Sequence, residues 1–171
     1  MYIFRSIFTT CCFLTSSQVF AQDNLCNDRE VPVFSCHLGK KIASLCATND
    51  LNETTGALYY RMGSKKNIEM TFPETPAHPS KQFILGGMMY VGGGGDFVRF
   101  SRGEYTYTVY SSSGQNGRDN AIPWNREGVT VRKDGKLLSN LLCKDAALSS
   151  DGWSKIYAAK LPADDDRSQE P

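Results

Sequence analysis

Four segments of this 171-residue chain share one layout: an apolar-rich stretch, a tight glycine-containing turn and a second apolar-rich stretch. In the third segment Tyr105, Tyr107 and Val109 alternate with Thr106 and Thr108. A period of two, with β-branched and aromatic side chains, indicates strands rather than helices. Each segment has about sixteen residues, which is the length of a hairpin of two typical strands. The four predicted hairpins span residues 31–46, 57–72, 96–111 and 128–143.

This series predicts an all-β, mainly antiparallel fold of about eight or nine strands in hairpins, forming a sandwich or an open barrel. Glycine adopts a positive φ without steric cost, so the turns are placed by glycine. The expected turns are Gly39-Lys40, Gly63-Ser64, Arg102-Gly103 and Asp134-Gly135. A further strand is expected over residues 82–91, interrupted at Gly86-Gly87. The run Gly92–Gly95 predicts a sharp corner or a close approach of the backbone.

The remaining segments read as connections. Residues 73–79 hold three prolines, which cannot donate to a strand ladder, and predict a rigid connector. The polar stretch Ser111–Asn120 predicts a loop, and residues 153–160 predict at most a short C-terminal helix. Residues 163–171 include three consecutive aspartates and no large apolar residue, which predicts a disordered acidic tail. One β domain is therefore expected over residues 22–162.

The N-terminus has the features of a signal peptide. Arg5 precedes a short run of apolar and small residues, and Val19-Phe20-Ala21 suits the cleavage pocket of a signal peptidase. The run is too short to span a bilayer, and the residues before Cys11 do not resemble a lipoprotein box. We therefore expect residues 1–21 to be cleaved, with no membrane insertion of the mature chain. The mature chain has 18 basic and 18 acidic residues, a balance that argues against a nucleic-acid partner.

Four cysteines remain in the mature chain, and an even number in an exported domain predicts a disulfide framework. If Gly39-Lys40 is a two-residue turn, Cys36 lies opposite Ala43 and Cys46 lies opposite Val33. Because neighbouring strand residues face opposite ways, Cys36 and Cys46 then point to different sides of the sheet. This disfavours a bridge between them and favours Cys26–Cys46 with Cys36–Cys143, although a bulged turn reverses the argument. The absence of a C-x-x-C spacing argues against a metal site, and no cofactor is expected.

The sequence shows no catalytic constellation. Cys36 precedes His37, but adjacent strand residues face apart, so a nucleophile–base pair is not expected there. His78 lies among prolines, and no G-x-S-x-G, H-E-x-x-H or phosphate-loop motif is present. We therefore expect a binding protein rather than an enzyme. The best candidate for contact is the polar loop that leaves the aromatic strand and returns at Ile122-Pro123-Trp124. A plain connection between two hairpins is the alternative interpretation.

Three runs of the chain, FSCHLGKKIASLCA, LYYRMGSKKNIEMTFP and FVRFSRGEYTYTVYSSSG, resemble small periplasmic proteins of Gram-negative bacteria. Among these the chain resembles the immunity proteins that neutralise type VI secretion amidases. In that family a serine-containing loop enters the cleft of the peptidoglycan-degrading amidase. The resemblance implies a periplasmic inhibitor whose loop contacts the amidase through Ser112 and Ser113. The implied partner-binding residues are Ser111, Ser112, Ser113, Gly114, Gln115 and Asn116.

Two other interpretations stay open. Periplasmic lysozyme inhibitors insert a Ser-Gly-x-x-Tyr-type loop, which Ser101–Tyr105 approximates, although Arg102-Gly103 there also reads as a hairpin turn. A structural or adhesive domain of an envelope assembly would use exposed sheet edges. The sequence leaves the oligomeric state open.

Overall fold

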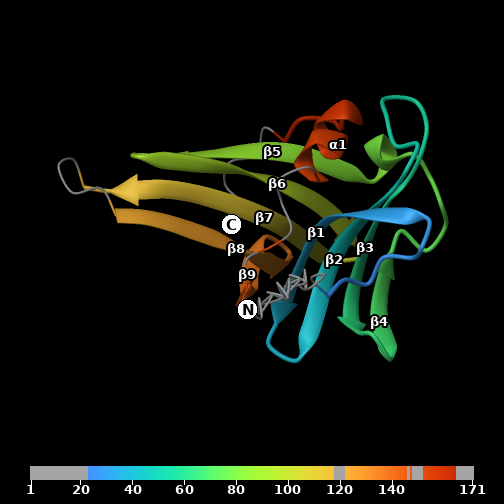
Figure 1. Cartoon of the computed structure of the whole chain (residues 1–171), viewed down its shortest axis with the longest axis horizontal. Helices are drawn as coiled ribbons and strands as arrows, with labels where there is room; N and C mark the ends of the chain where they lie inside the picture. The colour runs from blue at the N-terminus through green and yellow to red at the C-terminus, as the bar shows by residue number, and fades with distance from the viewer. Residues whose placement is uncertain (1–22, 118–121, 146, 148–151, 165–171) are drawn as a thin grey trace, which may run out of the picture.

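A computed structural model describes residues 23–117, 122–145, 147 and 152–164, so the predicted signal peptide lies outside the described residues. The described part is mainly antiparallel β-structure, with nine strands in two sheets and one short helix (Figure 1). It contains two disulfides. The predicted fold class is confirmed.

The first four strands form one sheet in chain order. They are β1 (Glu30–Leu38), β2 (Lys41–Thr48), β3 (Leu58–Ser64) and β4 (Asn67–Phe72). The first turn is Gly39-Lys40, as predicted, because Leu38 pairs with Lys41. The second turn falls at Lys65-Lys66 rather than at Gly63-Ser64. Gly63 instead occupies a β-bulge with φ 149°, where a Cβ would lie 2.4 Å from the carbonyl oxygen of Asn67.

The other five strands form a second sheet, again in chain order. They are β5 (Phe83–Tyr90), β6 (Gly93–Arg102), β7 (Tyr105–Asn116), β8 (Ile122–Lys133) and β9 (Lys136–Leu142). Asp134-Gly135 forms the last hairpin turn with both residues at positive φ, as predicted. The β6–β7 turn is Gly103-Glu104, one residue later than predicted.

Of two glycine predictions, the interruption at Gly86-Gly87 is wrong, and the run Gly92–Gly95 shows the close backbone approach that was one of its two expected roles. Gly86-Gly87 does not interrupt β5, because both residues pair with β6 and Gly86 leaves room for the ring of Phe97. Gly93–Gly95 is not a corner but the start of β6, and the turn before it is Val91-Gly92. At Gly95 a Cβ would lie 2.2 Å from the carbonyl oxygen of Ser111, so the run serves close packing of strands.

The main core lies between the two sheets at the end near the β6–β7 turn. Phe100 stacks on Phe72 of the first sheet at 4.4 Å and on Tyr107 of its own sheet at 5.1 Å, between ring centroids. A 3₁₀ turn, η1 (Pro79–Lys81), lies in the connector to β5, and α1 (Gly152–Ala158) packs on β1. The predicted helix over residues 153–160 is thus confirmed with shifted bounds.

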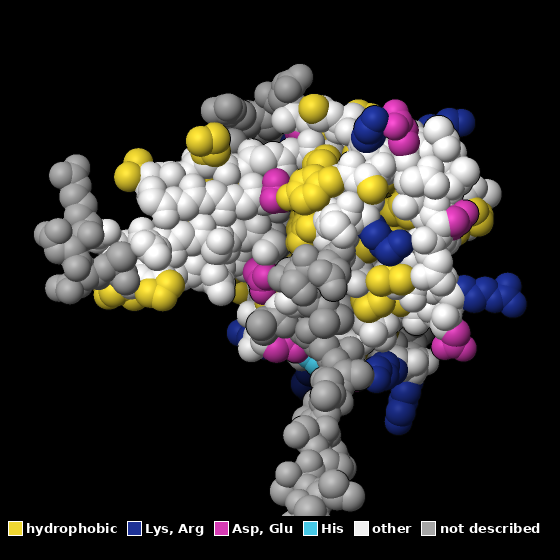
Figure 2. Space-filling model, turned by 45° about the horizontal axis from the view of Figure 1, so that its top comes forward, with side chains coloured by type: hydrophobic (Ala, Val, Ile, Leu, Met, Phe, Trp, Pro, Cys, Tyr) yellow, Lys and Arg dark blue, Asp and Glu magenta, His cyan; other side chains and the backbone are white. Residues whose placement is uncertain are grey.

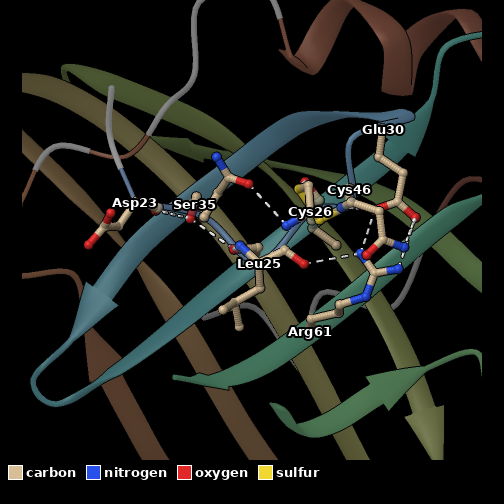
Figure 3. The surroundings of a disulfide bond; sticks show 11 residues. Asp23, Leu25, Cys26, Glu30, Ser35, Cys46 and Arg61 are labelled. Carbon is tan, nitrogen blue, oxygen red and sulfur yellow. Dashed lines mark hydrogen bonds and ion pairs between the residues drawn. A yellow bond between two sulfur atoms is a disulfide. The ribbon is translucent and has the colours of Figure 1, made fainter. Parts of the chain in front are cut away.

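The disulfides are Cys26–Cys46 and Cys36–Cys143, which confirms the favoured connectivity. Cys36 lies opposite Ala43 as predicted, whereas a bulge in β1 places Cys46 opposite Pro32 rather than Val33. The bulge lies outside the stretch between the two cysteines and the turn, so they still face opposite sides. The Cys26–Cys46 disulfide joins the N-terminal segment to β2 beside the ion pair of Glu30 and Arg61 (Figure 3). Two disulfides are typical of proteins of oxidising, extracytoplasmic environments.

The C-terminal segment is ordered further than expected. Ala163 bridges Leu85 in parallel, the Asp164 N–H donates to the Leu85 carbonyl, and the Asp164 carboxylate pairs with the buried Arg99. The predicted tail boundary at residue 163 is therefore too early, and residues 165–171 lie outside the described part. No described helix has the length and hydropathy that crossing a lipid bilayer requires.

Candidate functional site

The five-stranded sheet is much longer than the four-stranded sheet that covers it (Figure 1). On the face of this sheet that the four-stranded sheet covers, the main core extends as far as three paired residues, Val98, Val109 and Val129. Beyond these residues, parts of four strands project past the sandwich. We call this projecting part the arm; it consists of residues 87–90, 93–96, 111–116 and 122–127.

The segment predicted to form the binding loop lies inside the arm. Ser111–Asn116 is not a loop but the second half of β7, paired with β6 on one side and with β8 on the other. The glycines of β6 and the stretch 122–127 of β8 supply hydrogen-bonding partners on both sides, so a polar sequence still forms a central strand. Gly117 follows β7, and residues 118–121 lie outside the described part.

Strand geometry divides these residues between two faces. Ser111, Ser113 and Gln115 share the face of Asp96, whose carboxylate accepts a hydrogen bond from Tyr157 of α1. Ser112, Gly114 and Asn116 lie on the opposite face, which we call the open face. The structure therefore does not bring Ser112 and Ser113 to one side.

The serines also differ in their partners. Ser111 donates to Glu127 at 2.9 Å, and Glu127 in turn accepts from the Ala147 N–H at 2.7 Å. Ser112 is buried and donates to the Arg126 carbonyl at 3.0 Å, whereas Ser113 is exposed. Of the two serines that the resemblance singles out, Ser113 alone is placed for contact with a partner.

A hollow of about 560 Å³ lies on the open face of the arm. It contains three aromatic residues, several polar residues and one arginine. Its lining consists of Tyr90, Val91, Tyr110, Ser112, Asn116, Trp124, Arg126, Asn140 and Leu142. Sequence reasoning found Ser112, Asn116 and Trp124 but missed the others. Period-two alternation along Trp124, Arg126 and Gly128 was the available signal.

Gly114 makes room for the indole ring that lines the hollow. A Cβ at this position would lie 2.6 Å from the Trp124 ring, so glycine lets the indole lie across β7. The Tyr90 ring is 6.0 Å from the Trp124 ring, and the Arg126 guanidinium lies 5.6 Å above it. Across the hollow, the Tyr110 hydroxyl donates to the Asn140 side-chain carbonyl at 2.9 Å. Burial raises the pKa of Tyr110, and this hydrogen bond and the Arg126 charge offset the shift only in part.

The end of the arm exposes large apolar side chains. Met89, Val91 and Ile122 are 88%, 103% and 68% exposed, and we call these three residues the tip. The view in Figure 2 shows hydrophobic side chains at this end, and among the described residues in that view no charged ones beyond the base of the arm. Among the described arm residues, charge is confined to Asp96, Arg126 and Glu127, which all lie near the base. Covering the tip therefore desolvates no described charge.

The residues weighed as catalytic or metal-binding have structural partners. Cys36 is bonded to Cys143, so it carries no free thiol here. The Nδ1 of His37 lies 2.7 Å from a carboxylate oxygen of Asp145, and the ring nitrogens of His78 contact Ser80 and the Asn52 carbonyl. In the described part, one cluster has metal-ligand spacing: Cys26, Glu30 and Cys46. Its two sulfurs form a disulfide and Glu30 is paired with Arg61.

Comparisons with protein-family models, with curated proteins and with solved structures return no significant match. The function must therefore be argued from the geometry of the arm.

Proposed function

We propose that this protein is an exported, non-enzymatic inhibitor that binds and blocks the active site of a peptidoglycan-degrading amidase in the periplasm, as immunity proteins do. The arm enters the cleft of the enzyme. The single observation that carries the proposal is the projection of the arm beyond the sandwich with an uncharged apolar tip, Met89, Val91 and Ile122.

The hydrogen bonding of the arm supports this role. A strand paired on both sides loses little conformational entropy on binding, whereas a flexible loop must be ordered at a cost. Ser111–Asn116 is paired with β8 throughout and with β6 as far as Gly114, and the Gln115 N–H donates to the Gly92 carbonyl at 2.8 Å. The serine segment that the resemblance singles out therefore lies in a strand that is already ordered before binding, which favours tight binding.

The size of the arm is also adequate. Four strands about 4.8 Å apart, two with four residues and two with six at about 3.4 Å per residue, give two faces of roughly 300 Å² each. With the tip added, this approaches the roughly 800 Å² per partner of a standard protein–protein interface. Exposed apolar side chains with no described charge beside them form the kind of patch that such interfaces bury.

The test uses the mature protein, residues 22–171, against separate pools of periplasmic and secreted amidases and lysozymes. We expect stoichiometric capture and inhibition of an amidase. The variants Met89→Asp and Ser113→Arg place a charge or bulk on the arm and should weaken inhibition at least about tenfold. Ile68→Asp is the matched control, since Ile68 is 45% exposed on β4, outside the arm.

The possible outcomes separate the interpretations. Inhibition that both arm variants leave unchanged would show that another surface makes the contact. Capture of lysozyme would direct the search to Ser101–Tyr105, which lies at the β6–β7 turn, at the opposite end of the sheet from the tip. Self-association without an enzyme partner would favour an envelope assembly domain. The edge strand β9 would then be the first surface to test, because it exposes Leu137, Leu138 and Leu142.

A further inference from the structure

The hollow on the open face has a chemistry that the tip lacks. One wall consists of the Trp124 and Tyr90 rings, and the floor includes Tyr110 and Ser112. Tyr110 is 4% exposed and belongs to a small cluster with Met88 and Phe97, so the floor is fixed by packing. A concave site of about 560 Å³ with aromatic walls and a few polar groups matches the general form of small-ligand sites.

Two side chains offer this hollow hydrogen-bond donors that no described acceptor takes. The Arg126 guanidinium lies over the Trp124 ring and has no carboxylate partner in the described part. The neighbouring Glu127 faces the other side of the sheet, where it accepts from Ser111. Asn140, which also lines the hollow, uses its carbonyl oxygen to accept from Tyr110, so its amide N–H groups have no described acceptor.

This combination selects a ligand with acceptors and an amphipathic ring. A guanidinium binds a carboxylate through two parallel hydrogen bonds, which adds both energy and orientation. Aromatic rings such as those of Trp124 and Tyr90 offer an apolar surface to the C–H face of a pyranose, and the Asn140 amide suits a hydroxyl or carbonyl group of a sugar. A lipid would leave these donors unpaired at a cost.

We propose that the hollow binds a sugar that carries a carboxylate, with the carboxylate on Arg126 and the sugar ring against Trp124. The inference does not rest on the inhibitor proposal, because it uses the hollow and a small ligand rather than the tip and an enzyme. In a compartment that contains peptidoglycan, a suitable probe is the disaccharide N-acetylglucosaminyl-N-acetylmuramic acid, which combines sugar rings with a carboxylate.

The experiment follows the fluorescence of Trp124. The chain has two tryptophans, and the other, Trp153, is 8% exposed, with no described partner for its indole N–H. The variant Trp153→Phe therefore leaves one reporter and removes no described hydrogen bond. Circular dichroism confirms folding, and calorimetry on the unaltered protein repeats the measurement if this variant does not fold.

Three further probes are titrated in parallel: chitobiose, which lacks the carboxylate, D-lactate, which lacks the sugar, and the dipeptide D-alanyl-D-alanine. We expect saturable binding of the carboxylated disaccharide and at least about tenfold weaker binding of each other probe. Arg126→Gln should weaken binding of the disaccharide at least about tenfold, whereas Arg29→Gln, an exposed arginine at the start of the first sheet, should not.

Several results would overturn the proposal. Equal binding of chitobiose would remove the role of the carboxylate, and equal binding of D-lactate would reduce the hollow to a simple anion site. Equal binding of the dipeptide would show that the hollow binds the C-terminus of a peptide. Absence of binding to all four probes, or full binding by Arg126→Gln, would leave no sugar site in the hollow. None of these results depends on whether an amidase is inhibited.

Discussion

The two disulfides should differ in what they contribute to stability. Cys36–Cys143 joins residues 107 positions apart and ties β1 to the end of β9 across the two sheets, whereas Cys26–Cys46 spans 20 positions within one sheet. A disulfide restricts the unfolded chain more when it closes a longer loop. In the chain-entropy relation the long loop contributes about 4.8 kcal/mol and the short loop about 3.3 kcal/mol, a difference of about 1.5 kcal/mol.

The assay compares Cys36→Ala/Cys143→Ala with Cys26→Ala/Cys46→Ala by urea unfolding at 25 °C. With a slope of about 2 kcal/mol/M, we expect the midpoint of the first variant to lie roughly 0.7 M below that of the second. Both substitutions remove a buried Cys side chain, since Cys36 and Cys46 are each 0% exposed, so the comparison cancels part of the packing loss. Equal midpoints, or a lower midpoint for the variant that lacks Cys26–Cys46, would refute the argument from loop length.

Three further changes test the structure. Burial favours a raised pKa for Glu30, but hydrogen bonds from Arg61 and the Asn27 N–H outweigh it and hold the pKa below its usual value. Glu30→Gln leaves Arg61 without a charged partner and should cost about 3–5 kcal/mol in urea unfolding at pH 7. Because the folded pKa is lowered, this loss is complete above the unfolded pKa and shrinks as the pH falls through the folded pKa. Asp164→Asn, which removes the carboxylate that pairs with the 4% exposed Arg99, should likewise lower the thermal midpoint, and an unchanged midpoint would mean that this ion pair of the C-terminal segment does not stabilise the fold. Titration of the denatured, unreduced mature protein should find no free thiol, and two reactive thiols would contradict the connectivity.

The sequence predicted the hairpins because each turn is a local event. Asp134-Gly135 has both residues at positive φ, and this dipeptide is typical of such a turn wherever it stands between two strands. The argument from strand parity disfavoured a Cys36–Cys46 bridge. It survived the bulge at Pro32–Phe34 because that irregularity falls before Cys36 and leaves the spacing from Cys36 through Gly39-Lys40 to Cys46 unchanged.

The arm could not be predicted, because what makes Ser111–Asn116 a strand lies elsewhere in the chain. Local composition favours a loop, since serine, glycine and asparagine are turn residues. The pairing with Gly93–Gly95 and with residues 122–127 overrides this preference. A glycine run is compatible with either a corner or a close backbone approach, and only the neighbouring backbone of β7, which leaves no space for a Cβ, explains why Gly95 lies in a strand.

The projection of the arm raises the question of what keeps four strands rigid without a second sheet over them. In two places an aromatic ring of one strand packs over a glycine of the neighbouring strand: Phe97 lies over Gly86, and Trp124 lies over Gly114. Phe97 also packs in a small buried cluster with Met88 and Tyr110, which acts as a second core on the open face. A strand pair stabilised in this way needs no covering layer. The glycines that look like weak points in the sequence therefore free both faces and the tip of the arm for contact with a partner.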